Sequence, residues 1–364
     1  MKVLIVNPIL YTNENRNIKK VNTIKDTMIY DLCLAFKVKG CDITLAASDL
    51  YKPIQNEKYP FNVVWMKTKC TKLFPPHSLP FCPETKKIAK NGNFDLIITS
   101  EVFSLNSLSL AVHSYKNLIV WQELGKHNRI MHGYASKIWY GIIAKMFFRK
   151  ALIVARSEQA KKFISKYCKN VSDEIIDHGV NTKKFIPETE KDNQFAISSQ
   201  LIKRKQIDKS ITAFANYFKK YDSSAKLYIM GDGEEKENLV DLSKKLGADK
   251  NIFFTGKLGH DELIKILAKS KAMLVYTQSD LNMVSIVESI SLATPVITTS
   301  IPYCSTYIKR ERLGIVSDNW NEDDLFEISQ RKEYINNCMN YRRTLSTEYK
   351  AGQFLKEKGL NFNE

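Results

Sequence analysis

Short apolar runs recur along the chain, and the stretches between them repeat apolar residues at helical spacing. The runs are continuous rather than alternating, which is typical of strands buried on both faces of a parallel sheet. Strands that alternate with helices indicate βαβ units, and two such series indicate two doubly wound domains. The predicted strands cover residues 3–6, 43–47, 63–66, 96–99, 118–121 and 152–155, then 195–198, 227–230, 252–254, 273–276, 296–298 and 315–316.

A polar segment at residues 181–193 lacks apolar periodicity and contains Pro187, which predicts the domain boundary. We expect two Rossmann-like α/β domains, residues 1–182 and 183–335, that face each other across a cleft. Residues 336–364 form a predicted C-terminal helical segment, which we expect to pack back on the N-terminal domain. A chain of 364 residues is long enough for two domains.

The composition narrows the class of protein. Hydrophobic residues make up 44% and charged residues 26%, as in soluble globular proteins. The first apolar run is too short for a signal sequence or a membrane span. The seven cysteines include no C-x-x-C pair, which argues against a zinc or thioredoxin-like site and favours a reducing compartment. We therefore expect a cytoplasmic protein.

Positive charge is concentrated in the first half. Residues 1–182 contain 27 Lys and Arg against 14 Asp and Glu, a net charge of +13 within the total of +16. Such a surface attracts an anionic partner, either nucleic acid, an acidic membrane or a phosphorylated substrate, or it is simply a solvated Lys-rich surface. Residues 137–150 mix large apolar and basic side chains. They suit a peripheral contact with anionic lipid, or a core helix with basic ends.

The most informative chemistry lies where the predicted strand 273–276 leads into a helix. Glu288 is the only charged residue between Leu281 and Ile308, and a carboxylate in apolar surroundings needs hydrogen-bond donors. A ribose diol would supply two such donors. In the alternative interpretation, the Glu288 side chain faces solvent or pairs with an Arg. Backbone N–H groups at the helix start, Met283 to Ser285, would suit a diphosphate one turn away.

Two further loops follow strands of the second half. The first contains Gln200, Arg204 and Lys205 after residues 195–198, and ligands of open α/β sheets bind at the carboxyl ends of strands. Basic residues there would neutralise a leaving diphosphate, or they form an ordinary basic loop. The second contains Gly231 and Gly233, which permit a tight turn. No G-x-G-x-x-G or Walker sequence occurs, which argues against classical dinucleotide or P-loop binding.

These motifs together resemble glycosyltransferase family 4, whose members are retaining enzymes of the GT-B fold that use sugar nucleotides. The resemblance covers about residues 150–320. It rests on two acids separated by seven residues, on an Ala-Thr-Pro-Val strand, and on short motifs in the family's order. In this sequence they are Asp280 and Glu288, residues 293–296, the Gly231-Asp232-Gly233 turn, Phe254-Thr255-Gly256, and Gly179-Val180-Asn181 with Phe185-Ile186-Pro187.

The resemblance implies roles for individual residues. Asp280, Glu288 and Lys205 would be catalytic: Asp280 would meet the transferred sugar, Glu288 the ribose, and Lys205 the phosphates. Gln122, Glu123 and His127 are weaker candidates on the acceptor side. The implied donor-binding residues are Gln200, Arg204, Gly231, Gly233, Gly256, Lys257, Leu258, Met283, Val284, Ser285 and Glu288.

The chain departs from the family pattern in its N-terminal loop, residues 13–20, which lacks the glycines that the family often has there, and at three single positions. Gln200 stands where the family has Arg, Asp280 replaces Glu, and Gln122 stands near the usual position of a His. These departures affect the donor and acceptor sites rather than the predicted fold.

The expected function is that of a hexosyltransferase. It would move a sugar from a nucleoside-diphosphate sugar to a lipid-linked or saccharide acceptor in bacterial surface polysaccharide synthesis (capsule, lipopolysaccharide or exopolysaccharide). We expect no cofactor, no metal and no nucleic-acid partner, and a location in the cytoplasm or peripherally on the cytoplasmic face of the inner membrane. Two alternatives remain: a sugar-nucleotide epimerase or hydrolase of the same fold, and a non-catalytic protein that binds an anionic ligand.

Overall fold

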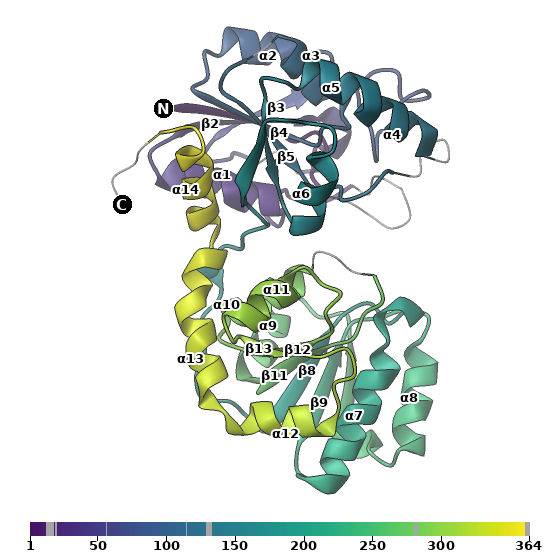
Figure 1. The fold of residues 1–364 in the computed structure, drawn as a ribbon. Helices are drawn as coiled ribbons and strands as arrows, with labels where there is room; N and C mark the ends of the chain where they lie inside the picture. Colours follow the sequence, from purple (N-terminus) through teal and green to yellow (C-terminus); the bar gives the residue numbers. More distant parts are fainter. Residues whose placement is uncertain are drawn as a thin grey trace. The chain divides into compact units, whose positions relative to one another are not determined.

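The computed structural model describes residues 1–11, 18, 20–55, 57–113, 115–128, 133–279 and 283–360. The chain forms two compact units (Figure 1). Unit 1 comprises Met1–Gly179 and Thr347–Glu364, and unit 2 comprises Val180–Ser346. Each unit contains one open parallel sheet with helices on both faces, so the predicted class of two Rossmann-like α/β domains is confirmed.

Unit 1 is built on a seven-stranded parallel sheet in the order β3-β2-β1-β4-β5-β6-β7. Alternate residues of each central strand enter different cores, which explains the continuous apolar runs: Val3 and Ile5 face one core, and Leu4 and Val6 face the other. The strands are β1 (Lys2–Val6), β2 (Asp42–Ser48), β3 (Asn62–Met66), β4 (Leu96–Ser100), β5 (Leu118–Gln122), β6 (Leu152–Ala155) and β7 (Val171–Ile175).

The helices of unit 1 divide between the two faces of its sheet. α1 and α14 supply side chains to one core, while α2, α3, η3 and α6 supply the other. The helical elements are α1 (Met28–Val38), η1 (Asp49–Tyr51), α2 (Thr85–Asn91), α3 (Leu105–Val112), α4 (Tyr134–Ile138), the π-helical η3 (Trp139–Ala144), α5 (Lys145–Phe147), α6 (Glu158–Ile164) and α14 (Thr347–Lys356).

Unit 2 has a six-stranded parallel sheet in the order β10-β9-β8-β11-β12-β13. Its strands are β8 (Gln194–Ser198), β9 (Lys226–Met230), β10 (Ile252–Gly256), β11 (Ala272–Val275), β12 (Val296–Thr298) and β13 (Gly314–Val316). Its helical elements are η4 (Thr182–Lys184), η5 (Lys203–Lys205), α7 (Ile207–Lys220), α8 (Lys236–Lys245), η6 (Asp249–Asn251), α9 (His260–Lys269), α10 (Val284–Ser291), α11 (Cys304–Arg310), α12 (Glu322–Gln330), α13 (Lys332–Tyr341) and η7 (Arg342–Leu345).

All twelve predicted strands are present, but the apolar pattern missed β7. This strand pairs only with β6, at the edge of the sheet. Its residues Asp173 and Glu174 are exposed, so it contains no continuous apolar run. An edge strand that is open to solvent resembles a polar loop in the sequence.

The chain returns to unit 1 at its C-terminal end, as expected. α14 packs against α1, and Phe354 contacts the ring of Trp121 at 5.3 Å between centroids. The buried Lys350 ammonium pairs with Asp177, just after β7. The divisions lie at residues 179/180 and 346/347, whereas the sequence suggested 182/183 and 335/336, so α13 belongs to unit 2.

No helix within the described ranges is both long and apolar enough to cross a membrane. All seven cysteines are free thiols, and Cys70 is the one that is exposed.

Candidate functional site

The carboxyl ends of β8 and β11 form the topological switch point of unit 2, because the chain continues from these neighbouring strands toward opposite edges of the sheet. Open α/β sheets bind ligands at this place. The Gln278 N–H donates to the Arg204 carbonyl at 3.1 Å, which joins the loops that follow the two strands. Lys205 and Met283 line the same small cavity of about 10 Å³. The structure therefore brings the predicted basic loop to the beginning of α10.

α10 begins without a side-chain cap. Its N-cap residue is Met283, whose side chain makes no capping hydrogen bond, and Val284 and Ser285 occupy the first turn. An uncapped helix start offers backbone N–H groups and a positive dipole end to an anion. Asp280, the predicted sugar-contacting acid, lies outside the described residues.

Glu288 lies one turn into α10, with 16% of its side chain exposed. Its Oε1 is 3.1 Å from Nε2 of His260, the first residue of α9. The carboxylate therefore does not point into bulk water, and its observed partner is a histidine rather than an arginine. The His260 ring also packs edge-on against Phe185.

The contact between His260 and Glu288 predicts a pH-dependent stability. The hydrogen bond to Glu288 raises the pKa of His260 above its usual 6.5. A raised folded-state pKa means that the stabilisation is complete below about pH 6.5 and is lost as the pH rises through the higher value. We expect His260→Gln to lower the melting temperature slightly at acidic pH and not at alkaline pH. Thermal melts from about pH 5.5 to about pH 8.5 check this.

A matched background separates this pair from other titrating groups. In a Glu288→Gln protein, the same His260→Gln change should have an effect that no longer depends on pH. If His260→Gln instead lowers the melting temperature of the wild-type protein by the same amount at every pH, the pair does not stabilise the fold.

Three hydroxyl groups at the carboxyl ends of β8 and β12 are buried. They are Ser199 Oγ, Thr298 Oγ1 and Thr299 Oγ1, and none has a hydrogen-bond partner among the described residues. Buried polar atoms in proteins are nearly always paired. These three therefore mark an edge of the sheet where a polar ligand would complete the hydrogen bonding.

The predicted glycine turn has a structural reason in this fold. A Cβ atom on Gly231 would lie 1.8 Å from the Ser199 carbonyl oxygen, and one on Gly233 would lie 2.4 Å from the Leu201 carbonyl oxygen. Both glycines thus let the loop after β9 pack on the loop after β8. Their direct contact with a donor stays a prediction.

The remaining donor-side predictions fall on the same edge. Gly256 ends β10 with a left-handed φ of 71°, followed by the exposed Lys257 and the half-buried Leu258. Gln200 is exposed and Arg204 is half-buried. Their roles toward a ligand stay predictions as well.

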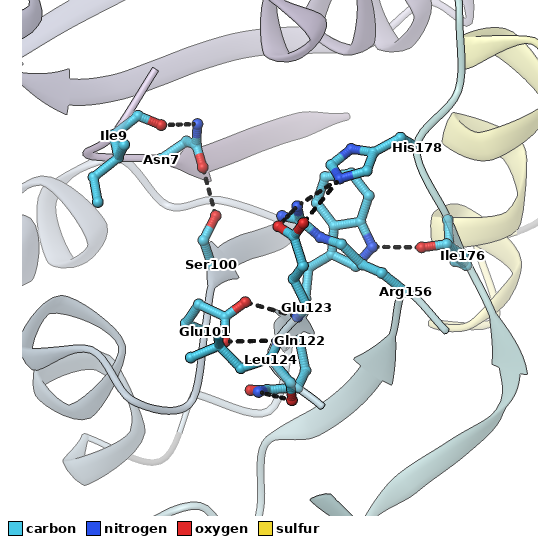
Figure 2. Close-up of polar contacts among 11 residues, drawn as sticks. Asn7, Ile9, Ser100, Glu101, Gln122, Glu123, Leu124, Arg156, Ile176 and His178 are labelled. Atoms are coloured by element: carbon cyan, nitrogen blue, oxygen red, sulfur yellow. Dashed lines mark hydrogen bonds and ion pairs between the residues drawn. The ribbon is translucent and has the colours of Figure 1, made fainter. Parts of the chain in front are cut away.

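Unit 1 contains a cavity of about 590 Å³ at the carboxyl ends of its own strands. One part of its wall is apolar, formed by Ile9, Leu10, Met28, Ile29, Leu32 and Trp121. The other part is polar and is formed by Asn7, Ser100, Glu101, Glu123, Arg156 and His178. Figure 2 shows the polar groups: Asn7 and Ser100 form one contact, and Glu123, Arg156 and His178 converge.

Arg156 organises this polar wall. It is 6% exposed, and its guanidinium lies 3.6 Å from the centroid of the Trp121 ring. It donates to Glu123 Oε2 at 2.8 Å and lies 3.1 Å from His178 Nε2. Burial and then the Arg156 charge lower the pKa of His178. A planar cation held between an aromatic ring and a carboxylate is rigid.

Glu101 shapes the same wall from the end of β4. Its carboxylate accepts the backbone N–H groups of Glu123 at 2.7 Å and Leu124 at 3.4 Å (Figure 2). Burial raises the pKa of this carboxyl to about 7, although Arg156 acts in the opposite direction. The group therefore titrates near neutral pH, as proton-transferring groups often do.

The structure separates the three acceptor-side predictions. Glu123 lines the cavity, but Gln122 is fully buried. The Gln122 side chain accepts a hydrogen bond from Val102 N–H and donates to Leu124 O and Tyr140 Oη. His127 packs among aromatic rings and contacts Ser136 Oγ at 3.0 Å. Gln122 and His127 are absent from the cavity lining, so their placement is explained by structural contacts.

Sequence reasoning missed Glu101, Arg156 and His178. The rule that places ligands at the ends of strands would have found two of them, because Glu101 follows β4 directly and Arg156 follows β6 directly. His178 follows β7, which had no apolar signal.

Residues 180–333 match the family model described as Glycosyl transferases group 1. This segment covers nearly all of unit 2. Nearly all of unit 2 therefore matches the group 1 glycosyltransferase family. The match falls in the half of the chain that contains the predicted donor-binding motifs.

The alpha-monoglucosyldiacylglycerol synthase of Streptococcus pneumoniae is 24% identical over 265 residues, covering 66% of this chain and 59% of that protein. An uncharacterized glycosyltransferase of Methanocaldococcus jannaschii is 24% identical over 185 residues, covering 49% and 46%. The chain thus spans about half of the length of these relatives.

Two solved structures resemble the whole chain in fold. HepE from Anabaena, in complex with UDP and glucose, has a TM-score of 0.63 at 12% identity and covers 99% of both chains. The lipopolysaccharide outer core galactosyltransferase WaaB, in its apo form, has a TM-score of 0.63 at 14% identity, covering 98% of this chain and 100% of that one. These similarities confirm the predicted GT-B fold class.

Proposed function

We propose that this chain transfers a hexose from a nucleoside-diphosphate sugar to a lipid-linked or saccharide acceptor. The observation that carries the proposal is the grouping at one edge of the unit 2 sheet. Lys205 and Met283, the N-cap residue of the uncapped helix α10, line one cavity there, and the shielded carboxylate of Glu288 lies one turn further along α10. Cations, helix amides and a carboxylate are the groups that a diphosphate attached to a ribose requires.

Each group has a distinct task in the proposed reaction. Glu288 accepts the two ribose hydroxyls, and the α10 amides hold the diphosphate. Lys205 and Arg204 neutralise the negative charge that develops as the nucleoside diphosphate leaves the sugar. The reaction needs no cofactor. No three His, Cys, Asp or Glu side chains of the described ranges gather as metal ligands would.

The finer parts of the proposal rest on names and on the motif resemblance. A relative is named a monoglucosyldiacylglycerol synthase, and WaaB is a lipopolysaccharide galactosyltransferase. We therefore place this chain in bacterial surface glycolipid or polysaccharide synthesis, as a retaining enzyme of family 4. HepE binds UDP and glucose, which favours a uridine diphosphate sugar among the donors to test.

The cavity of unit 1 supports an acceptor with both apolar and polar parts. Apolar side chains such as Ile29 and Leu32 would contact a lipid portion, while Glu101 and Glu123 would accept hydrogen bonds from hydroxyl groups. Burial raises the pKa of the Glu101 carboxyl to about 7, so this group suits transfer of the acceptor proton.

A thermal-shift screen against a panel of nucleoside-diphosphate sugars tests the proposal. A donor at a hundredfold excess over its Kd stabilises the native state by about 2.7 kcal/mol, which should raise the melting temperature by several degrees. We expect one sugar nucleotide to raise the melting temperature more than its bare nucleoside monophosphate does. No saturable shift with any donor would end the proposal.

The two alternative functions predict different results, which further binding and turnover assays distinguish. An epimerase or hydrolase would bind a donor and turn it over without an acceptor, which an assay for released diphosphate or for the epimer detects. A non-catalytic anion binder would bind DNA or polyphosphate in a salt-dependent way and would ignore the sugar.

A further inference from the structure

The helical segment 134–147 of unit 1 carries apolar side chains on its outward face. It combines α4, η3 and α5 and runs along the edge of unit 1 beside α3 (Figure 1). The face turned to the core repeats every four residues as Ser136, Tyr140, Ala144 and Phe148, all buried. A surface helix normally has polar residues opposite such a face.

The outward face instead repeats large apolar residues at the same spacing. Tyr134, Ile138, Ile142 and Met146 have exposed fractions of 67, 58, 56 and 60%. They are offset by two positions from the buried row, so they lie on the opposite side of the helix. Single exposed apolar residues are common, but four in one row form a continuous patch, which marks an interaction surface.

The π-helical turn explains why this row stays straight. In a regular α-helix of about 3.6 residues per turn, a four-residue repeat drifts around the axis. The wider turn at Trp139–Ala144 counteracts the drift, so Ile138 and Met146 remain in line. Turns of this kind are rare and occur often at functional sites.

Basic side chains flank the apolar row. Lys137, Lys145, Arg149 and Lys150 are all exposed, and Lys137 lies 5.6 Å from the centroid of the Tyr134 ring. Between residues 124 and 157 the sequence contains seven Lys and Arg and no Asp or Glu. An apolar row beside a purely cationic one matches the interface of an anionic bilayer, with acyl chains below and negative headgroups at the side.

We propose that residues 134–150 lie in the plane of an anionic membrane, with the row of Tyr134, Ile138, Ile142 and Met146 in the acyl boundary and the basic residues at the headgroups. This surface is independent of the donor site in unit 2. Its test measures lipid binding and not sugar transfer, so its failure would leave the proposed activity untouched.

Flotation with vesicles tests the proposal on the full chain. We expect binding to vesicles of phosphatidylcholine mixed with phosphatidylglycerol, weaker binding to phosphatidylcholine alone, and a loss of binding as salt is raised. Replacing Ile138, Ile142 and Met146 by Ser should reduce partitioning at least tenfold. Lys145→Glu with Arg149→Glu should reduce it by about tenfold or more, because each basic residue near the surface contributes about 1 kcal/mol.

Unit 1 provides matched controls. Val38, Ile54 and Leu73 are equally exposed apolar residues outside this segment, so their replacement by Ser should leave partitioning unchanged. Lys86→Glu with Lys87→Glu is the charge control on the exposed side of α2. If each control reduces binding as much as its test variant, the contact is not located at residues 134–150 and the proposal fails.

Two further measurements make the outcome decisive. An environment-sensitive fluorophore on Ile142→Cys, in a Cys70→Ser protein, should shift to the blue with anionic vesicles, whereas one on Ile54→Cys should not. Absence of vesicle binding by the wild-type protein would overturn the proposal. A second result would also overturn it: light scattering shows a dimer in the absence of lipid, and the triple Ser variant dissociates that dimer. The face would then bind a second copy of the chain.

Discussion

Replacing Glu288 by Gln is expected to weaken binding of the sugar nucleotide by about tenfold to a hundredfold while the fold survives. A charged acceptor contributes about 1.5–3 kcal/mol to a hydrogen bond, and an amide of the same size offers one oxygen where the carboxylate offers two. Because the side chain is 16% exposed, little water is present to compensate for the loss. Calorimetric titration with the donor chosen in the screen measures the change, and kcat/KM should fall at least as far.

Two variants show whether the loss arises from the ligand. Glu237→Gln removes an exposed carboxylate on α8 of the same unit and should leave the affinity unchanged. His260→Gln breaks the same ion pair but keeps the Glu288 carboxylate. If His260→Gln weakens binding as much as Glu288→Gln, the carboxylate acts only through its partner, and its assignment to the ribose is wrong.

Replacing Gly231 by Ala should strongly destabilise unit 2. The residue has φ of +148°, which L side chains rarely adopt, and the new Cβ would lie 1.8 Å from the Ser199 carbonyl oxygen. Backbone on both sides leaves no flexible group to move away, so the cost should exceed about 4 kcal/mol. We expect the melting temperature, measured by circular dichroism, to fall by roughly 10 °C or more.

Gly247→Ala is the matched control for this substitution. Gly247 also has a left-handed φ, +69°, but an added Cβ would meet no atom within 4 Å. Its cost should be confined to the backbone conformation, about 1–2 kcal/mol. Equal melting temperatures for the two variants would show that the loops after β8 and β9 are not packed as closely as described.

Gly231→Ala also connects the fold to the proposed activity. The loop that must move contains Ser199 and leads into Lys205. Any protein that still folds should therefore bind the diphosphate of the donor more weakly than Gly247→Ala does. The glycines named as donor-binding in the sequence would then act by positioning the loop and not by touching the ligand.

Much of the donor site was predictable because its residues are close in sequence. Ser285 and Glu288 lie about one turn apart on one helix, and Met283 is the N-cap of that helix. The loop with Lys205 was predictable as well, since it directly follows a buried strand. By contrast, the partner of Glu288 was not, because His260 is 28 residues away and no periodicity links them.

The sequence by itself determined the two series of parallel strands, the helical C-terminal end and the loops that carry polar residues. These features depend on apolar periodicity and on turn residues, which are local. The tertiary structure decided the rest: the assignment of α13 to unit 2 and only α14 to unit 1, the steric need for Gly231, and the wall of Glu101, Arg156 and His178. Those contacts depend on the order of strands in each sheet, since β4, β5, β6 and β7 become neighbours only through pairing. Which distant strands pair with one another cannot be read from the apolar periodicity of either segment.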